Sequence, residues 1–311
     1  MPAFVTHELF GTHVFSSLDK PIQELLEQNP APYFWGLQGP DLMFFRDAIL
    51  RRSILPRYAS ILHRAKTDEL FTALSCYLTM HKGRPAYGTL AAYVLGFVGH
   101  YCLDCEAHPY IYFKQMQKER ALGEEMAIGV HSRIESDIDT AFYELKKGRN
   151  IREYRPAKRL YGTEEEHELI ARMYVMLLWE VYGLRVRDTE IKKCFRDASM
   201  MIQLSLDRKG ALLPLVGAAE MMMGKPSMYT QHFRRKEVKE DILNLEHEPW
   251  FCLQTPDKVD TRSFPQIFYY AGYKAVDMME SIYHCSQHGI VYDPKNLKSF
   301  DYGSPDDAGN E

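Results

Sequence analysis

Apolar residues recur every three to four positions along most of the chain, the period of amphipathic helices. Between residues 17 and 28, for example, Leu18, Ile22 and Leu25 follow this spacing, and the pattern ends at Asn29-Pro30. Further helices are predicted over residues 67–80, 124–145, 164–180, 188–205 and 267–284. Alternating strand patterns bounded by Asn-Gly or Asp-Gly turns are absent from the sequence. The pattern therefore predicts an all-α fold.

Residues 90–107 are apolar on nearly all sides, which indicates a helix buried at the centre of the fold. Its apolar run is interrupted by His100 and is too short to cross a bilayer, so we expect no transmembrane segment. Because proline interrupts helices, we expect Pro109 to end this one and to turn the chain directly after His108.

Residues 146–162 are polar, basic and punctuated by glycine and proline. We expect this stretch to separate a metal-site region at 1–150 from a helical region at 151–300 that packs on it. The acidic residues 301–311 have no hydrophobic pattern, so we expect a mobile tail there. The role of the C-terminal half and the oligomeric state stay open.

The 311 residues are 46% hydrophobic, enough for a sizeable core. They include 38 Lys and Arg residues and 42 Asp and Glu residues. This near-balance argues against general nucleic-acid binding, and we expect no stable nucleic-acid complex. The first residues lack the basic and apolar regions of a secretory signal. The six cysteines are too scattered for a disulfide framework, and we interpret Cys102 and Cys105 as core thiols. We expect a cytoplasmic protein.

Chemistry-bearing residues concentrate in GHYCLDCEAHPY, residues 99–110. His100, Asp104 and His108 are spaced four and four, so on a helix they form one stripe. Such polar groups are costly to bury unless something compensates them. A divalent cation does so, since imidazole and carboxylate are common zinc ligands.

Other candidates surround this stripe in the sequence. His131 and Glu135 repeat the spacing of a His and a carboxylate one helical turn apart. Asp41 follows a turn-like Gln-Gly-Pro and can direct a carboxylate into a site, while His63 and His7 are isolated candidates. Alone, each of these is more often a core or surface residue, but the combination predicts metal binding.

Several enzyme classes are excluded by missing motifs. The sequence has no His-Asp dipeptide, no complete H-E-x-x-H, no G-x-x-x-x-G-K-[ST] and no G-x-S-x-G. These absences argue against HD-type phosphohydrolases, zincin proteases, P-loop NTPases and the usual serine hydrolases.

The ordered candidates resemble bacterial zinc-dependent phospholipase C, whose superfamily includes fungal single-strand-specific nucleases. Seven elements match in order through the N-terminal half. The first three are an early His in THELF, a loop Asp and a following His. The next three are the His and the Asp of a central L-G-x3-H-x3-D helix and a third ligand a little further on, and the last is an H-S-x2-E element. In this chain they are His7, Asp41, His63, His100, Asp104, His108 and the pair His131 and Glu135.

The resemblance implies a compact helical fold with two or three zinc ions. One ion would be held by Asp41, His63, His100 and Asp104, and a second by His108, His131 and Glu135. Asp104 would bridge to a third ion shared with His7 and, in the family, with a mature N-terminal Trp. No Trp precedes His7 in this chain. After ordinary Met removal, the amine of Pro2 would be the group available for that role.

Phosphodiester hydrolysis is the reaction that suits such a site, because adjacent cations can clamp a phosphoryl group and lower the pKa of water. Asp41 is the carboxylate that we would assign as general base, and Asp104 as the bridging ligand. The substrate would be a phospholipid or a small phosphodiester. A nuclease or nucleotide phosphodiesterase using the same metals, and a non-catalytic zinc-stabilised protein, are the alternatives.

A methionine-rich stretch, AEMMMG at residues 219–224, has two interpretations. It could line a groove for an acyl chain, since Met packs adaptably. We favour core filling, because the methionines lie in a helical pattern. No amphipathic segment stands out as a membrane-interface anchor.

Overall fold

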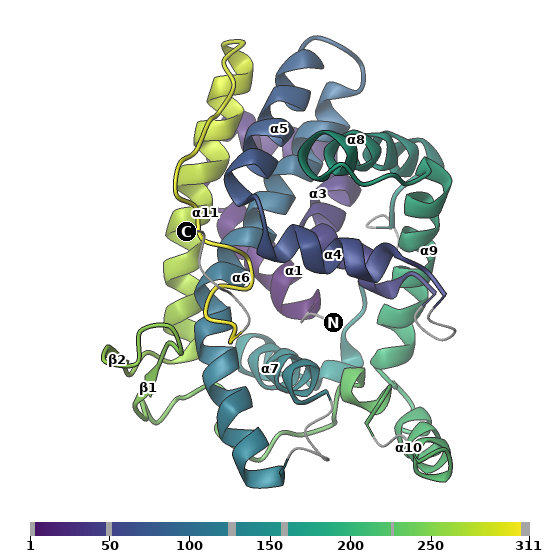
Figure 1. The fold of residues 1–311 in the computed structure, drawn as a ribbon, viewed down its shortest axis with the longest axis vertical. Coiled ribbons are helices and arrows are strands. Elements are labelled where there is room, and N and C mark those ends of the chain that lie inside the picture. The colour runs from purple at the N-terminus through teal and green to yellow at the C-terminus, as the bar shows by residue number, and fades with distance from the viewer. Residues whose placement is uncertain (1–3, 48–51, 124–128, 157–160, 225–226, 306–311) are drawn as a thin grey trace.

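The computed structural model describes residues 4–47, 52–123, 129–156, 161–224 and 227–305, and these form an all-α fold (Figure 1). The elements in chain order are α1 (Phe4–Phe15), α2 (Lys20–Gln28), α3 (Pro30–Gly36), η1 (Gly39–Phe45), α4 (Leu55–Arg64), α5 (Thr67–Met80), α6 (Tyr87–Leu122), α7 (Val130–Lys147), η3 (Ile151–Glu153), α8 (Glu164–Tyr182), α9 (Asp188–Ser205), α10 (Leu212–Met222), η5 (Thr230–His232), β1 (Trp250–Phe251), β2 (Val259–Asp260) and α11 (Phe264–Gln287). The elements labelled η are short 3₁₀ helices, and β1 pairs antiparallel with β2.

Hydrophobic spacing predicted most helices well. Helices α5 and α9 have the predicted bounds, while α8 and α11 extend the predicted ranges by a few residues. Helix α2 begins three residues later than predicted, after Asp19. Helix α7 begins at Val130, after Gly129 in a left-handed conformation, and residues 124–128 of the predicted range lie outside the described residues.

The prediction that Pro109 ends the central helix was wrong. Helix α6 continues through Pro109 to Leu122 and ends at Gly123. Proline in a helix interior costs about 3 kcal/mol through a lost hydrogen bond and a steric clash. Burial outweighs this cost, because every residue from Ala107 to Phe113 is buried. The uninterrupted helix carries His100, Asp104 and His108 on one rigid element.

Close contact between α3 and α6 sets the position of the site. A Cβ atom added to Gly96 would lie 2.3 Å from the backbone oxygen of Tyr33, and one added to Gly36 would lie 2.2 Å from the backbone oxygen of Tyr93. Only glycine at both positions permits this approach. The contact holds the end of α3, and the loop that follows it, against the turn of α6 that carries His100.

The hydrophobic core draws on both halves of the sequence. Helices α3 and α11 pack extensively along α6, and α8 packs against α5 and α9 (Figure 1). Cys102 and Cys105 are buried free thiols, as expected of core residues. The chain after α11 returns to α6, where the fully buried ring of Phe300 contacts Phe71, Phe97 and Tyr101.

Two further expectations can be compared with the structure. In the described ranges, no helix is both long and apolar enough to cross a membrane. The interpretation of the methionine-rich stretch as core filling was wrong. Met221 and Met222, at the end of α10, are 77% and 89% exposed. A helical pattern of apolar residues predicts the helix but not whether another element covers it.

Candidate metal centre

Four of the predicted residues form one buried group: Asp41, His63, His100 and Asp104. Each offers a ligand atom within 4.8 Å of the others. Asp41 enters from η1 because Gly39 turns the chain with φ of +51°, and a Cβ atom there would lie 2.4 Å from the His100 ring. The Gln-Gly-Pro turn therefore positions the carboxylate, as its sequence indicated.

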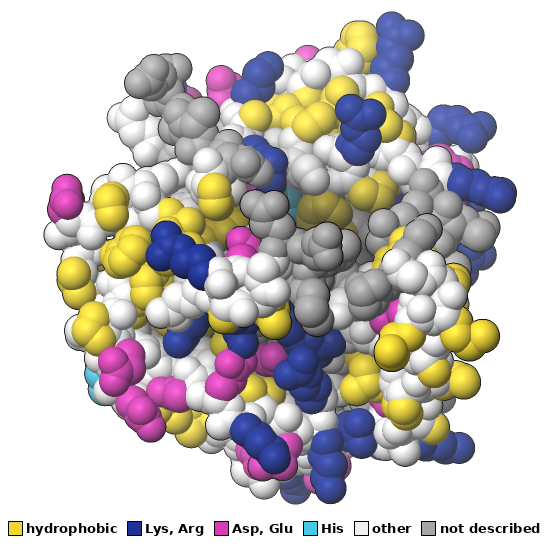
Figure 2. Space-filling model, turned by 60° about the horizontal axis from the view of Figure 1, so that its bottom comes forward, with side chains coloured by type: hydrophobic (Ala, Val, Ile, Leu, Met, Phe, Trp, Pro, Cys, Tyr) yellow, Lys and Arg dark blue, Asp and Glu magenta, His cyan; other side chains and the backbone are white. Residues whose placement is uncertain are grey.

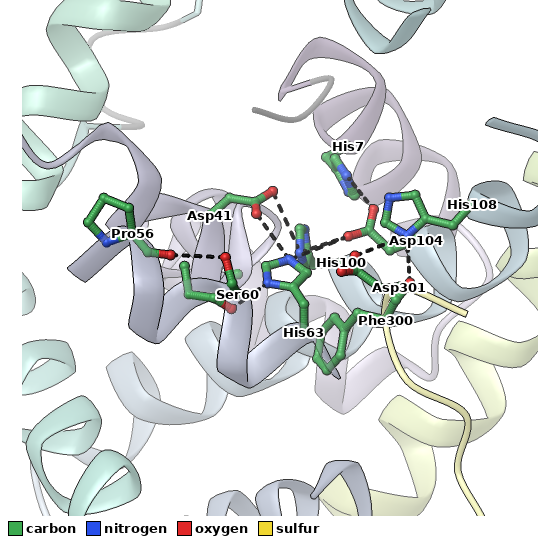
Figure 3. A network of polar contacts seen from close by, with 12 residues as sticks. His7, Asp41, Pro56, Ser60, His63, His100, Asp104, His108, Phe300 and Asp301 are labelled. Carbon is green, nitrogen blue, oxygen red and sulfur yellow. Dashed lines mark hydrogen bonds and ion pairs between the residues drawn. The ribbon is translucent and has the colours of Figure 1, made fainter. Parts of the chain in front are cut away.

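Within this group the imidazole Nε2 atoms face the carboxylates (Figure 3). His63 Nε2 lies 3.1 Å from Asp41 Oδ1 and 3.9 Å from Asp104 Oδ2. His100 Nε2 lies 3.1 Å from Asp104 Oδ2 and 3.7 Å from Asp41 Oδ2. Two carboxylates and two imidazoles from three elements thus converge on one point.

A second group contains His108, His131 and Glu135. The Oε1 atom of Glu135 lies 3.2 Å from His131 Nε2 and 3.7 Å from His108 Nε2. His131 and Glu135 are one turn apart on α7, whereas His108 comes from α6. The contact of these two helices therefore assembles the group.

Asp104 and His7 connect the two groups. Asp104 lies between His100 and His108 on α6, one turn from each, and its Oδ1 lies 3.1 Å from His7 Nε2. The His7 ring stacks on the His100 ring with centroids 4.5 Å apart. All eight predicted residues therefore lie around one site. Figure 3 shows Asp104 between His7, His100 and His108. Pro2, the expected source of a terminal amine, lies outside the described residues.

Four of the five histidines share an orientation. Each holds its Nδ1 atom against an oxygen outside the groups and its Nε2 atom toward a carboxylate. The oxygens are those of Ala59 with His63 at 2.7 Å, Leu37 with His100 at 3.3 Å, Phe300 with His108 at 2.5 Å and the Gln115 side chain with His131 at 3.0 Å. A donated Nδ1–H leaves the Nε2 lone pair directed inward. Metal-ligating histidines show this arrangement.

The imidazoles and carboxylates perturb one another strongly. Burial alone would lower the pKa of His63, but the hydrogen bond and charge of Asp41 raise it to about 9. Burial likewise opposes protonation of His108, but Asp104 and Glu135 raise its pKa to about 10. Burial would raise the pKa of Asp104, and the neighbouring histidines hold it well below its usual range. In the absence of metal, protons therefore take the place of cations between these groups.

Two buried polar atoms of the site, His7 Nδ1 and Asp41 Oδ2, make no hydrogen bond to any described residue, and His100 Nε2 has only its contact with Asp104 Oδ2 at 3.1 Å. A buried polar atom without a hydrogen bond costs about 1–3 kcal/mol. His100 Nε2 and Asp41 Oδ2 both face the centre of the first group, 3.7 Å apart. A cation between them would satisfy both atoms, so the residues present fit a bound metal.

The two groups line one cavity of about 450 Å³. Asp41, His63, Asp104, His108, His131 and Glu135 form its polar floor, and Phe44 and Tyr112 supply aromatic walls. Arg64, 44% exposed, and Asp301 stand at its edge, with Arg64 Nε 2.9 Å from Asp301 Oδ2. The cavity therefore combines buried acidic and imidazole groups with a guanidinium.

Sequence reasoning missed the supporting residues. Gln115 and Phe300 hold His131 and His108 through their Nδ1 atoms, and Asp301 Oδ1 lies 3.8 Å from His108 Nδ1. Asp301 begins the segment that we expected to be a tail, and residues 306–311 of that segment lie outside the described residues. No sequence signal relates residue 300 to residue 108, because this contact depends on how the chain returns after α11.

Comparisons with known proteins add no relationship, since no family model, no curated protein and no solved structure matches the chain. The structure itself defines the class. This is an all-α protein with two adjoining, buried groups of His, Asp and Glu residues that could hold metal ions.

Proposed function

We propose that the chain is a zinc-dependent phosphodiester hydrolase of the kind that the sequence resembles. The observation that supports this proposal is that imidazole Nε2 atoms converge on the carboxylates of the site. His63 and His100 direct Nε2 at the first pair of carboxylates, and a backbone oxygen contacts the Nδ1 atom of each ring. A purely structural cluster of histidines and aspartates does not require an oxygen at the Nδ1 atom of four of its five imidazoles.

Asp41, His63, His100 and Asp104 would hold one zinc ion, and His108, His131 and Glu135 a second, with His7 and Asp104 available to a third. Bound there, zinc would supply Lewis acidity toward a phosphoryl oxygen and a water of lowered pKa. The ligand types, imidazole and carboxylate, are those that zinc accepts.

The chain's own residues complete a site for an anionic diester. Asp41 lines the cavity, and its carboxylate is the acceptor that we assign as general base. Arg64 at the cavity edge can pair with a phosphate oxygen, because its planar guanidinium matches that geometry. A volume of about 450 Å³ suits a headgroup or a nucleotide rather than a folded polymer.

The first test is metal content, measured by inductively coupled plasma mass spectrometry on untagged protein purified without added metal. We expect two or three zinc ions per chain, and the count reports whether the third position is filled. No bound metal, even after zinc is supplied, would contradict the proposal.

The second test is turnover of phosphatidylcholine, single-stranded DNA and a small chromogenic phosphodiester. Loss of a metal ligand removes several kcal/mol of transition-state stabilisation, so we expect His100→Ala to lower activity by about a thousandfold. The matched control is His284→Ala, since His284 is 49% exposed and lies outside the site. Hydrolysis of DNA but not of lipid would favour a nuclease. Bound zinc without any turnover would indicate a metal that serves the fold alone.

A further inference from the structure

Helix α10 reverses the usual relation between polarity and burial. It contains a single charged residue, Glu220, which is also its only buried residue. Its apolar side chains face solvent: Leu215 is 67% exposed, and Met221 and Met222 are 77% and 89% exposed. The helix projects from the body beside α9 (Figure 1). Figure 2 shows hydrophobic side chains gathered along the right-hand edge, the side on which Figure 1 places α10.

Polar contacts, rather than apolar packing, hold α10 in place. At its first turn, the two carboxylate oxygens of Asp207 accept hydrogen bonds from the backbone N–H groups of Leu212 and Leu213, both at 3.0 Å. Near its last turn, Glu220 accepts hydrogen bonds from the backbone N–H of Thr230 at 3.0 Å and from its hydroxyl at 2.7 Å. The fold therefore fixes the helix without using its apolar face. Exposed apolar patches of this kind mark interaction surfaces.

Basic residues lie at the base of the helix. Arg208 and Lys209 precede its first turn and are exposed. Both side chains lie directly before the apolar helix, so positive charge and exposed apolar surface adjoin. A partner with negative charges beside an apolar interior would match both features.

We propose that α10 is an interfacial helix that inserts its Leu and Met side chains into an anionic lipid surface while Arg208 and Lys209 contact lipid phosphates. A projecting helix suits a bilayer, which needs no groove of complementary shape, and unbranched Met side chains adapt to acyl chains. Docking of this kind goes beyond the proposed hydrolysis and does not depend on it. Asp104→Asn should bind vesicles as the wild type does, even where it hydrolyses nothing.

The experiment is vesicle flotation of the full chain with two kinds of vesicle. One contains phosphatidylcholine alone, and in the other about one lipid in three is the anionic phosphatidylserine. We expect binding to the mixed vesicles that weakens as salt rises, because exposed charges are screened. Replacing Met222 by Gln should weaken binding about tenfold, the order expected for a lost apolar side chain. Replacing Arg208 by Gln should weaken it about fivefold.

A matched control distinguishes α10 from apolar exposure in general. Met223 and Met80 are 56% and 55% exposed, but Met80 lies at the end of α5. Met223→Gln should weaken vesicle binding and Met80→Gln should not. Met222→Leu should restore the binding that Met222→Gln loses, which separates insertion from misfolding.

Three results would overturn the proposal. The first is a wild-type chain that floats with neither vesicle, and the second is an equal effect of Met223→Gln and Met80→Gln. The third is a concentration-dependent dimer in analytical ultracentrifugation that the Met222→Gln substitution abolishes, because α10 would then bind a second copy of the chain.

Discussion

Replacing Asp104 by Asn is the substitution that tests the metal centre most directly. The side chain keeps its shape but loses the charge that faces His7 and His100, each 3.1 Å away. Breaking a buried ion pair by removing one partner costs about 3–5 kcal/mol. Because Asn retains one oxygen acceptor, we expect the metal-free variant to lose stability near the lower end of that range.

Bound metal makes a second contribution to stability, which can be measured separately from the effect of the lost charge. A metal present at about a thousand times its dissociation constant stabilises the folded state by about 4 kcal/mol. At roughly 2–4 °C per kcal/mol, each ion that chelation removes should lower the melting temperature of the wild type by about 10 °C. Asp104→Asn should lose the ion that Asp104 holds and keep the one at His108, His131 and Glu135, so chelation should lower its melting temperature by about 10 °C less than that of the wild type for each ion lost.

The assay is thermal unfolding of each protein with zinc and with a chelator, together with the metal count. Asp197→Asn is the matched control, because Asp197 is similarly buried and pairs with Arg46 at 3.0 Å, outside the site. That control should lose stability yet keep the full effect of chelation. If chelation shifts Asp104→Asn as much as the wild type, Asp104 is not a ligand and the reasoning fails.

Three further predictions concern the surroundings of the site. Gly96→Ala should lower the melting temperature, since overpacking costs about 1–3 kcal/mol, whereas Gly217→Ala, whose added Cβ atom has its nearest neighbour at 3.8 Å, should leave it unchanged or raise it. Phe300→Ala should cost about 3–5 kcal/mol in guanidinium unfolding, because the ring is fully buried. Asp301→Asn should weaken zinc binding about tenfold in a competition titration, as loss of an outer partner of a ligand does. Unchanged affinity would show that Asp301 does not support His108.

Local sequence patterns could predict the helices and those site residues whose arrangement depends on spacing within a single helix. His100, Asp104 and His108 follow from a four-residue repeat, and they lie together on α6 as that repeat requires. His131 and Glu135 follow from the same rule on α7. The all-α fold was predicted for the same reason, since helical periodicity is a local property.

Properties that depend on packing between distant elements could not be predicted. Pro109 was expected to end α6, but the burial that keeps the helix intact comes from segments remote in sequence, including the stretch around Phe300. The same stretch supplies the carbonyl that holds His108. Composition alone assigned residues 301–311 to a tail, and composition does not report that Asp301 lies beside Arg64.

The candidate metal centre and helix α10 differ in how the fold supports them, and this difference separates their tests. The candidate metal centre is built into the core, with His100 fully buried and its ring held by the Leu37 carbonyl, so its substitutions change stability as well as metal binding. The apolar side chains of helix α10 are exposed to solvent, so replacing Met222 should change vesicle binding while the melting temperature stays constant. A lipid-binding defect without loss of stability therefore points to α10, whereas a coupled loss of metal and stability points to the site around Asp104.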